Sequence, residues 1–299
     1  MKKYCILFNP KSGNGSGKNS VESLIESLNG AEVSKHDITS IKDYRAFFAG
    51  LSKDVAIVVC GGDGTLSRFA NDAYESIPEN DILFYATGTG NDFLNDLGIS
   101  VDDQKDPIDV KKYIVDLPTV VINGEEHKFV NGIGYGIDGY CCEVGDKLRA
   151  KGDGKSINYT SIAIKGLLFH YKPTNATVTI DGVKREFKKV WLTPTMNGRM
   201  YGGGMIATPD QNRLKNDTVS TLVFNGAGRL RTLMAFPAIF KGEHVKNPMC
   251  KVFTGKHVVV EFDRPVALQI DGETYLNISK YEVFAKVPAK NSLKEPAAV

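Results

Sequence analysis

Three glycine-rich stretches carry most of the residues in this sequence that could do chemistry. They are NPKSGNGSG (residues 9–17), GGDGTLS (61–67) and ATGTGNDF (86–93). Glycine lets a bound group approach the backbone, where successive N–H donors converge on an anion, and a helix that starts directly afterwards adds its dipole. The carboxylate of Asp63 has the wrong charge to contact phosphate directly, so we expect it to act through Mg²⁺, through water, or on a proton in flight.

The elements around these stretches predict where they lie in space. Apolar runs at residues 4–8 and 54–60 and from residue 81 read as buried strands, each followed by a glycine-rich loop and then by apolar residues at helical spacing. This order predicts a parallel sheet with helices on both faces and the three loops along one edge. The alternative, that each loop is only a tight connection, stays open for any single loop.

The sequence from about residue 105 has a different pattern. Asn123-Gly124 and Asp181-Gly182 each separate two strand-like runs, and further short strands are expected at 219–224, 256–262 and 266–270. These features predict a second, antiparallel β-rich domain. Two helices are expected in it, around 157–169 and 230–240, the latter broken or kinked near Pro237.

Composition excludes several classes of protein. The 299 residues contain 37 Lys and Arg against 35 Asp and Glu, and the net charge of +2 gives no support for nucleic-acid binding. No stretch approaches the roughly 18 apolar residues of a membrane-spanning helix, and the start lacks the features of a signal peptide. Five cysteines, an odd number without Cys-x-x-Cys, argue against disulfides and zinc and favour a cytoplasmic location.

Four motifs in order resemble the bacterial diacylglycerol kinase family, which is related to the sphingosine and ceramide kinases. They are NPKSG (9–13), GGDGT (61–65), GTGNDF (88–93) and QIDGE (269–273). The resemblance implies an N-terminal α/β domain like that of NAD kinases, a C-terminal antiparallel β-sandwich, and a nucleotide between them. The expected domains are residues 1–120, with a return strand within 281–299, and residues 121–280.

The resemblance also assigns residues to an ATP and Mg²⁺ site. The implied nucleotide-binding residues are Asn9, Pro10, Lys11, Ser12, Gly13, Thr39, Gly61, Gly62, Asp63, Gly64, Thr65, Leu66, Ser67, Thr89, Asn91 and Asp92. The match around Thr39 is poor. Ser67-Arg68 stands where relatives commonly have Asn-Glu after a hydrophobic residue, and Arg68 places a positive charge within one helical turn of the expected phosphates.

On the acceptor side, the resemblance makes Glu273 the group that takes the proton from the attacking alcohol, with Asp63 as the other catalytic carboxylate. Asp138 and Asp271 are the implied substrate residues. A carboxylate beside apolar walls can have its pKa raised to a useful value. The alternative for both aspartates is an Asp-Gly turn, with Glu273 merely solvated.

A structural metal site is implied at Leu214, Asp217 and Val219, through two carbonyl groups and one carboxylate that would suit Mg²⁺. Thr218 stands where the family usually has glycine, so the sequence departs from the pattern at this loop. The alternative is that Asp217 is only a turn residue before a strand.

The sequence therefore predicts an ATP- and Mg²⁺-dependent kinase that phosphorylates a lipid hydroxyl, with diacylglycerol as one acceptor, at the inner face of the membrane. The basic and apolar residues between 147 and 172 could meet a lipid or simply pack on the sandwich. Two rivals remain: an NAD kinase-like enzyme with a soluble acceptor, and a nucleotide- or lipid-binding regulator without catalysis. A homodimer is one of the oligomeric states that the sequence leaves open.

Overall fold

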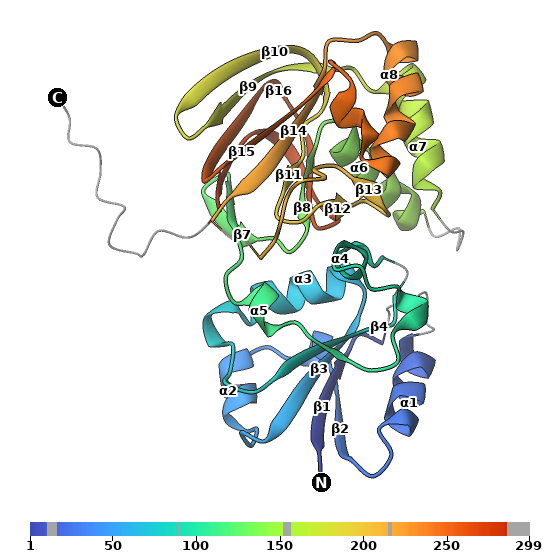
Figure 1. Ribbon diagram of the computed structural model, residues 1–299, viewed down its shortest axis with the longest axis vertical. Helices are drawn as coiled ribbons and strands as arrows, with labels where there is room; N and C mark the ends of the chain where they lie inside the picture. Colours follow the sequence, from blue (N-terminus) through green and yellow to red (C-terminus); the bar gives the residue numbers. More distant parts are fainter. Residues whose placement is uncertain (11–16, 89, 152–156, 215–216, 286–299) are drawn as a thin grey trace, which may run out of the picture. The chain divides into compact units, whose positions relative to one another are not determined.

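The computed structural model describes residues 1–10, 17–88, 90–151, 157–214 and 217–285 (Figure 1). The chain forms two compact units. The first comprises Met1–Asp116 and Met200–Gly204, and the second comprises Leu117–Arg199 and Met205–Val299. Each unit has its own sheet. Within the described residues, no helix is long and apolar enough to cross a lipid bilayer.

The sheet of the first unit has the strand order β2-β1-β3-β4-β5. The first four of these strands are parallel and β5 is antiparallel to β4. Burial on both faces explains the continuous apolar runs: Ile6, Leu7 and Val58 are fully buried. The strands are β1 (Lys3–Phe8), β2 (Glu32–Asp37), β3 (Val55–Gly61), β4 (Ile82–Ala86) and β5 (Ile108–Asp109).

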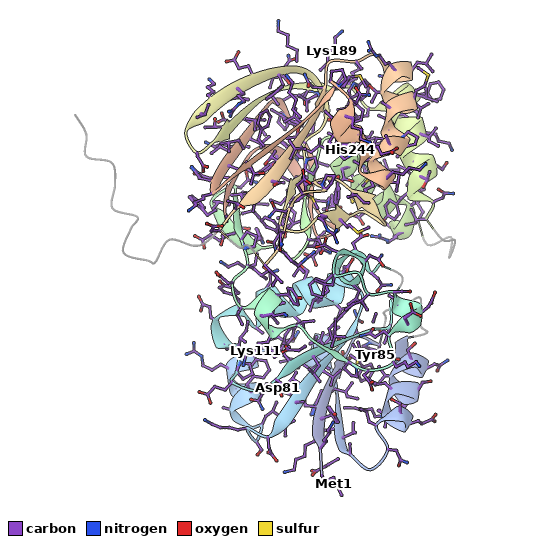
Figure 2. The ribbon with its side chains drawn as sticks, viewed as in Figure 1. Met1, Asp81, Tyr85, Lys111, Lys189 and His244 are labelled. Atoms are coloured by element: carbon purple, nitrogen blue, oxygen red, sulfur yellow. The ribbon has the colours of Figure 1, made fainter. Side chains whose placement is uncertain are left out.

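Helices cover both faces of this sheet, as predicted (Figure 1). Val21 and Leu24 of α1 pack against one face of the central strands, and Tyr44 of α2 packs against Phe69 of α3 with ring centroids 5.7 Å apart. Lys111 ties α5 to the turn before β4 by donating through Nζ to the carbonyl oxygen of Glu79 (Figure 2). The helices are α1 (Gly17–Ser27), α2 (Tyr44–Ala49), α3 (Asp63–Asp72), α4 (Asp92–Asp96) and α5 (Lys111–Ile114).

The second unit is an antiparallel β-domain, as predicted, with strand order β7-β6-β17-β16-β8-β11-β14-β10-β9 and β15 beside β14. The long strand β16 bends, because its register shifts between Glu261 and Leu268. Its first half pairs with β9 and its second half with β8, which closes a ring of strands around the core. The strands are β6 (Thr119–Ile122), β7 (Glu125–Lys128), β8 (Gly132–Tyr135), β9 (Thr174–Ile180), β10 (Val183–Leu192), β11 (Thr195–Met196), β12 (Met200–Tyr201), β13 (Met205–Ile206), β14 (Val219–Asn225), β15 (Cys250–Gly255), β16 (His257–Ile270) and β17 (Glu273–Phe284).

The predicted hairpin turns are confirmed by their backbone angles. Asn123-Gly124 has φ of 51° and 84°, and Asp181-Gly182 has φ of 49° and 82°. Asp271-Gly272, between β16 and β17, has the same two positive values, 46° and 94°. Positive φ at both central residues is the requirement of the type I′ turn, which explains the Asn-Gly and Asp-Gly pairs.

Helices gather on one side of the second sheet, where Figure 1 shows α7 and α8 side by side. Both predicted helices are present, and α8 ends at Ala235 just before Pro237, where a 3₁₀ turn continues the chain. Helix α6 was not predicted, since the sequence left Asp138 open as a substrate residue or part of an Asp-Gly turn. The helices and helical turns are α6 (Ile137–Ala150), α7 (Tyr159–Lys165), η5 (Gly166–His170), α8 (Arg229–Ala235), η6 (Phe236–Lys241) and η7 (Glu243–Lys246).

The C-terminal segment differs from the expected return to the first domain. Tyr281–Phe284 belong to β17, which pairs with β16 and β6 in the second unit. The reason is burial, because Tyr281 and Val283 are fully buried in the core of the β-domain. The remainder of the expected strand, residues 286–299, lies outside the described residues. The unit boundary falls between Asp116 and Leu117, slightly before the expected position.

Candidate active site

The carboxyl ends of four strands lie in one row in the first unit. In the strand register Phe8 pairs with both Asp37 and Cys60, and Gly61 pairs with Ala86. The loops that begin at Asn9, Ile38, Gly62 and Thr87 therefore leave the sheet along the same edge. The predicted common edge is confirmed for the described parts of these loops.

The glycines of the second and third loops allow two backbones to touch. A Cβ on Gly62 would lie 3.0 Å from the carbonyl oxygen of Gly90, and a Cβ on Gly88 would lie 3.0 Å from Cα of Gly62. A Cβ on Gly61 would overlap the side chain of Thr65. None of them has a positive φ, so close approach rather than left-handed backbone explains these glycines. Gly64 is different, since a Cβ there would meet open space.

Asp63 joins the same two loops through its carboxylate. Its Oδ2 accepts the N–H of Asp92 at 2.7 Å and its Oδ1 accepts the N–H of Phe93 at 3.2 Å. Its own N–H donates to the carbonyl oxygen of Gly90 at 3.0 Å. The N–H groups of Asp92 and Phe93 belong to the first turn of α4, whose N-cap residue Asn91 makes no side-chain cap bond. Asp63 thus caps α4 from a distant part of the chain, a positioning role that the sequence did not suggest.

Asp92 is buried and holds the glycine run of residues 202–204. Its Oδ2 accepts the N–H of Gly203 at 2.8 Å and its Oδ1 accepts the N–H of Gly204 at 2.7 Å. Burial raises the pKa of the Asp92 carboxyl above its usual value, although the two N–H donors act in the opposite direction. The glycine run was missed, and its only sequence signal was three consecutive glycines.

The other predicted nucleotide residues fall into four groups. Asn9 and Pro10 directly follow β1, and Thr39 follows β2, where both its N–H and its hydroxyl donate to Asp37 Oδ1. Leu66 and Ser67 are buried in α3. Asn91 donates through Nδ2 to the Gly88 carbonyl oxygen, and its buried Oδ1 has no hydrogen-bond partner in the described part of the chain. Lys11, Ser12, Gly13 and Thr89 lie outside the described residues.

In the second unit, Asp271 has a structural function like that of Asp63. Its Oδ2 accepts the N–H of Val130 at 2.6 Å, and its Oδ1 accepts the N–H groups of Asn131 and Gly132, each at 2.9 Å. The carboxylate therefore holds the chain just before β8 against the β16–β17 hairpin.

Gln269 connects the two predicted substrate aspartates, and the sequence gave it no role. Its Nε2 donates to Asp138 Oδ2 at 3.1 Å, and its Oε1 accepts the N–H of Gly272 at 2.6 Å. Gly134 makes room for this contact, because a Cβ there would overlap the Asp138 carboxylate. Asp138 lies in the first helical turn of α6 and is not part of an Asp-Gly connecting turn. The structure thus brings Asp138 together with the Asp271-Gly272 turn.

Glu273 is the first residue of β17 and its side chain is exposed. It follows the Asp271-Gly272 hairpin turn, and it pairs with Ile270 across the hairpin. The alternative reading of this motif as a hairpin turn is therefore correct for the backbone. The exposed Glu273 side chain directly follows Gly272, whose N–H donates to Gln269 Oε1.

The implied structural metal site stays a prediction, because it would use two backbone carbonyl groups and residues 215–216 of its loop lie outside the described residues. The exposed carboxylate of Asp217 lies 3.5 Å from Lys256 Nζ, so a cation already neutralises it. Val219 is paired in the β14–β15 ladder with Gly255, and Leu214 is exposed. No group of three or more His, Cys, Asp or Glu side chains that could hold a metal ion occurs among the described residues.

Family models match both parts of the chain. The diacylglycerol kinase catalytic domain matches residues 3–116, and the YegS C-terminal NAD kinase beta sandwich-like domain matches residues 131–288. The chain belongs to the diacylglycerol kinase family. It is accordingly a kinase-type enzyme of that family, and its two units correspond to the two matched domains.

Relatives of the diacylglycerol kinase family match over most of the chain. A diacylglycerol kinase of Mycobacterium tuberculosis is 27% identical over 273 residues, which are 87% of this chain and 85% of the relative. A diacylglycerol kinase of Bacillus subtilis is 24% identical over 282 residues, 91% and 90% of the two chains. The crystal structure of a putative diacylglycerol kinase from Bacillus anthracis has a TM-score of 0.65 at 18% identity and covers 95% of this chain and 92% of its own. This last likeness supports the fold.

Proposed function

We propose that the protein is an ATP- and Mg²⁺-dependent lipid kinase that transfers the γ-phosphate of ATP to a hydroxyl group of diacylglycerol or a related lipid. The single observation that carries this proposal is the alignment of four loops at the carboxyl edge of the first sheet in a chain of this family. Ligands of open α/β sheets bind outside the carboxyl ends of the strands.

The residues at this edge fit a nucleotide with its metal. Gly64 faces open space in the first turn of α3, where the helix dipole favours a negatively charged group such as phosphate. Asp63 keeps its place by capping α4, and a carboxylate oxygen is the ligand type that a hard cation such as Mg²⁺ prefers. When bound, the metal would neutralise charge on the transferring phosphate.

On the acceptor side, Glu273 accepts the proton of the lipid hydroxyl. The hydroxyl oxygen forms a bond to the γ-phosphorus, the bond from that phosphorus to the bridging oxygen of ADP breaks, and ADP leaves with the electron pair. Gln269 keeps Asp138 and the Asp271-Gly272 turn in a fixed arrangement beside this carboxylate. Catalysis of this kind depends mainly on positioning and charge neutralisation.

The experiment is a transfer assay with γ-labelled ATP and separate acceptors: diacylglycerol, a membrane lipid extract and NAD. We expect label in phosphatidic acid or another lipid and none in the NAD product. The Glu273→Gln variant should lose turnover, whereas Glu261→Gln, an exposed glutamate paired with Lys280 on the same sheet, should keep it. Labelled NAD would favour a soluble acceptor. ATP binding without transfer to any acceptor would favour a regulator and contradict the proposal.

A further inference from the structure

Large apolar side chains are exposed together on the helical side of the second unit. We name four of them the helical apolar face: Ile164 of α7, Phe169 of η5, and Leu230 and Met234 of α8. Phe169 and Met234 are each 69% exposed and Leu230 is 65% exposed. Leu230 and Met234 are four residues apart and share one face of α8. An exposed apolar cluster of this kind is typical of an interaction surface.

The four side chains belong to neighbouring elements. Arg229 at the start of α8 donates through Nη1 to the carbonyl oxygen of Leu167 in η5 at 2.8 Å. Figure 1 shows α7 and α8 side by side at the edge of this unit. Helix α8 and the segment α7–η5 are therefore neighbouring elements, and each exposes large apolar side chains.

The same helices already bury another apolar face against the fold. Ile162, Leu167 and Ile239 are almost completely buried. Gly166 approaches α6 so closely that a Cβ would lie 2.8 Å from Ile137 and Tyr140 side-chain atoms. Packing on the β-domain therefore explains why the buried residues are apolar, but it does not explain the exposed residues of the helical apolar face. Helices that are apolar all round are normally covered on every side.

The charge around the face identifies its partner. Residues 157–172 and 226–242 contain Lys165, Lys172, Arg229, Arg231 and Lys241 and no Asp or Glu, in a chain whose net charge is only +2. Lys165, Arg231 and Lys241 are exposed. Basic residues beside exposed apolar side chains are the pattern of helices that lie in the interface of an anionic membrane.

We propose that the helical apolar face inserts into the surface of an anionic lipid bilayer, with Lys165, Arg231 and Lys241 meeting the headgroups. This inference deepens the proposed function, since it gives the enzyme a way to reach a lipid acceptor. The biological role of the surface rests on the proposed lipid kinase activity. Binding itself requires neither ATP nor turnover.

The experiment measures vesicle binding of the full chain without ATP. Vesicles of phosphatidylglycerol and phosphatidylcholine are compared with phosphatidylcholine alone, at low and high salt. We expect binding to the anionic vesicles that weakens as salt rises. The double variant Phe169→Ser/Met234→Ser should bind at least about 10-fold more weakly, because each buried apolar side chain contributes a large transfer free energy.

Val183→Ser is the matched control, because Val183 is 53% exposed on β10, outside the face. It should bind like the wild type. Thermal unfolding of all variants checks that they are folded. Absence of wild-type binding to anionic vesicles, or equal binding by the double variant, would overturn the proposal. Sedimentation measures the oligomeric state of both proteins, and a dimeric wild type with a monomeric double variant and unchanged vesicle binding would also overturn it.

A short-chain, water-soluble diacylglycerol separates this proposal from the kinase activity. The double variant should phosphorylate that acceptor as fast as the wild type and lose activity only on vesicles. A protein that binds vesicles but phosphorylates no lipid would contradict the proposed function and leave the docking surface standing.

Discussion

Asp63 in the first unit and Asp271 in the second both hold a distant backbone segment through their carboxylates, although the local backbone around them differs. Each carboxylate accepts backbone N–H groups from a segment far away in the sequence, two for Asp63 and three for Asp271. Asp63 lies at a helix start where two backbones touch, whereas Asp271 lies in a hairpin turn with positive φ. An aspartate followed by a glycine can therefore anchor a distant segment of the chain, and beside the second of these anchors the Glu273 side chain is exposed.

The largest expected effect is a loss of activity without a loss of stability when Glu273, beside the anchoring residue Asp271, is replaced. Glu273→Gln should lower kcat by about 10²- to 10⁴-fold, the usual contribution of a positioned proton acceptor. Its free energy of unfolding should stay within about 0.5 kcal/mol of the wild type, because the side chain is exposed. Transfer assays and denaturant unfolding check both values. A folded variant with full activity would remove Glu273 from the mechanism.

Asp271→Ala should lower the free energy of unfolding by about 2–4 kcal/mol, because three N–H groups lose a charged acceptor. Asp181→Ala is the matched comparison, since Asp181 occupies the same turn position at φ 49°. Its Oδ1 accepts the N–H groups of Lys256 and His257 at an exposed site, so the loss should be about 1 kcal/mol or less. Equal losses in urea titrations would show that turn strain, and not the anchor, dominates.

Asp63→Ala should cost about 1.5–3 kcal/mol of unfolding free energy, because the first turn of α4 loses its cap. Asp72→Ala is the control in the same helix, where an exposed ion pair with Arg68 at 3.6 Å should contribute under about 0.5 kcal/mol. Both variants would be compared by denaturant unfolding. Unchanged stability in Asp63→Ala would contradict the capping role and leave only a chemical one.

The smallest effect concerns the pH dependence of Asp92. Burial raises its folded-state pKa above the ordinary 3.8, so folding favours the protonated form, and the associated stability is lost as pH rises from the unfolded pKa through the folded one. The difference in unfolding free energy between wild type and Asp92→Asn should therefore change across that window and level off above it. Denaturant unfolding at a series of pH values measures this difference. A difference that is constant with pH would contradict the burial effect.

Local patterns in the sequence were sufficient for much of the fold. Apolar runs identified three of the four parallel strands, β1, β3 and β4, because both faces of that sheet are covered, whereas the polar strand β2 was not predicted. The Asn-Gly and Asp-Gly pairs identified the turns because few other residues adopt positive φ. The common edge of the loops followed from the parallel order. Helix α6 was missed because Asp138-Gly139 resembles a turn, and only its packing on β16 shows that it starts a helix.

The anchoring contacts could not be predicted, because they join segments far apart in the sequence. Asp63 and Phe93 are 30 residues apart, and Asp271 and Val130 are 141 residues apart. Gln269 has the same limitation, since its amide bridges Asp138 and Gly272 only after α6 packs on β16. Sequence reasoning assigned chemistry to Asp63 and Asp271, whereas the structure also gives each a mechanical function.

The bend of β16 affects how rarely the β16–β17 hairpin, which carries Glu273, opens. Because its two halves pair with β9 and β8 and its whole length with β17, opening β16 would break the ring at several ladders at once. Amide hydrogens along this strand should be among the slowest in the chain to exchange with deuterium. The hairpin that presents Glu273 is thus attached to an element that opens only when the β-domain as a whole unfolds.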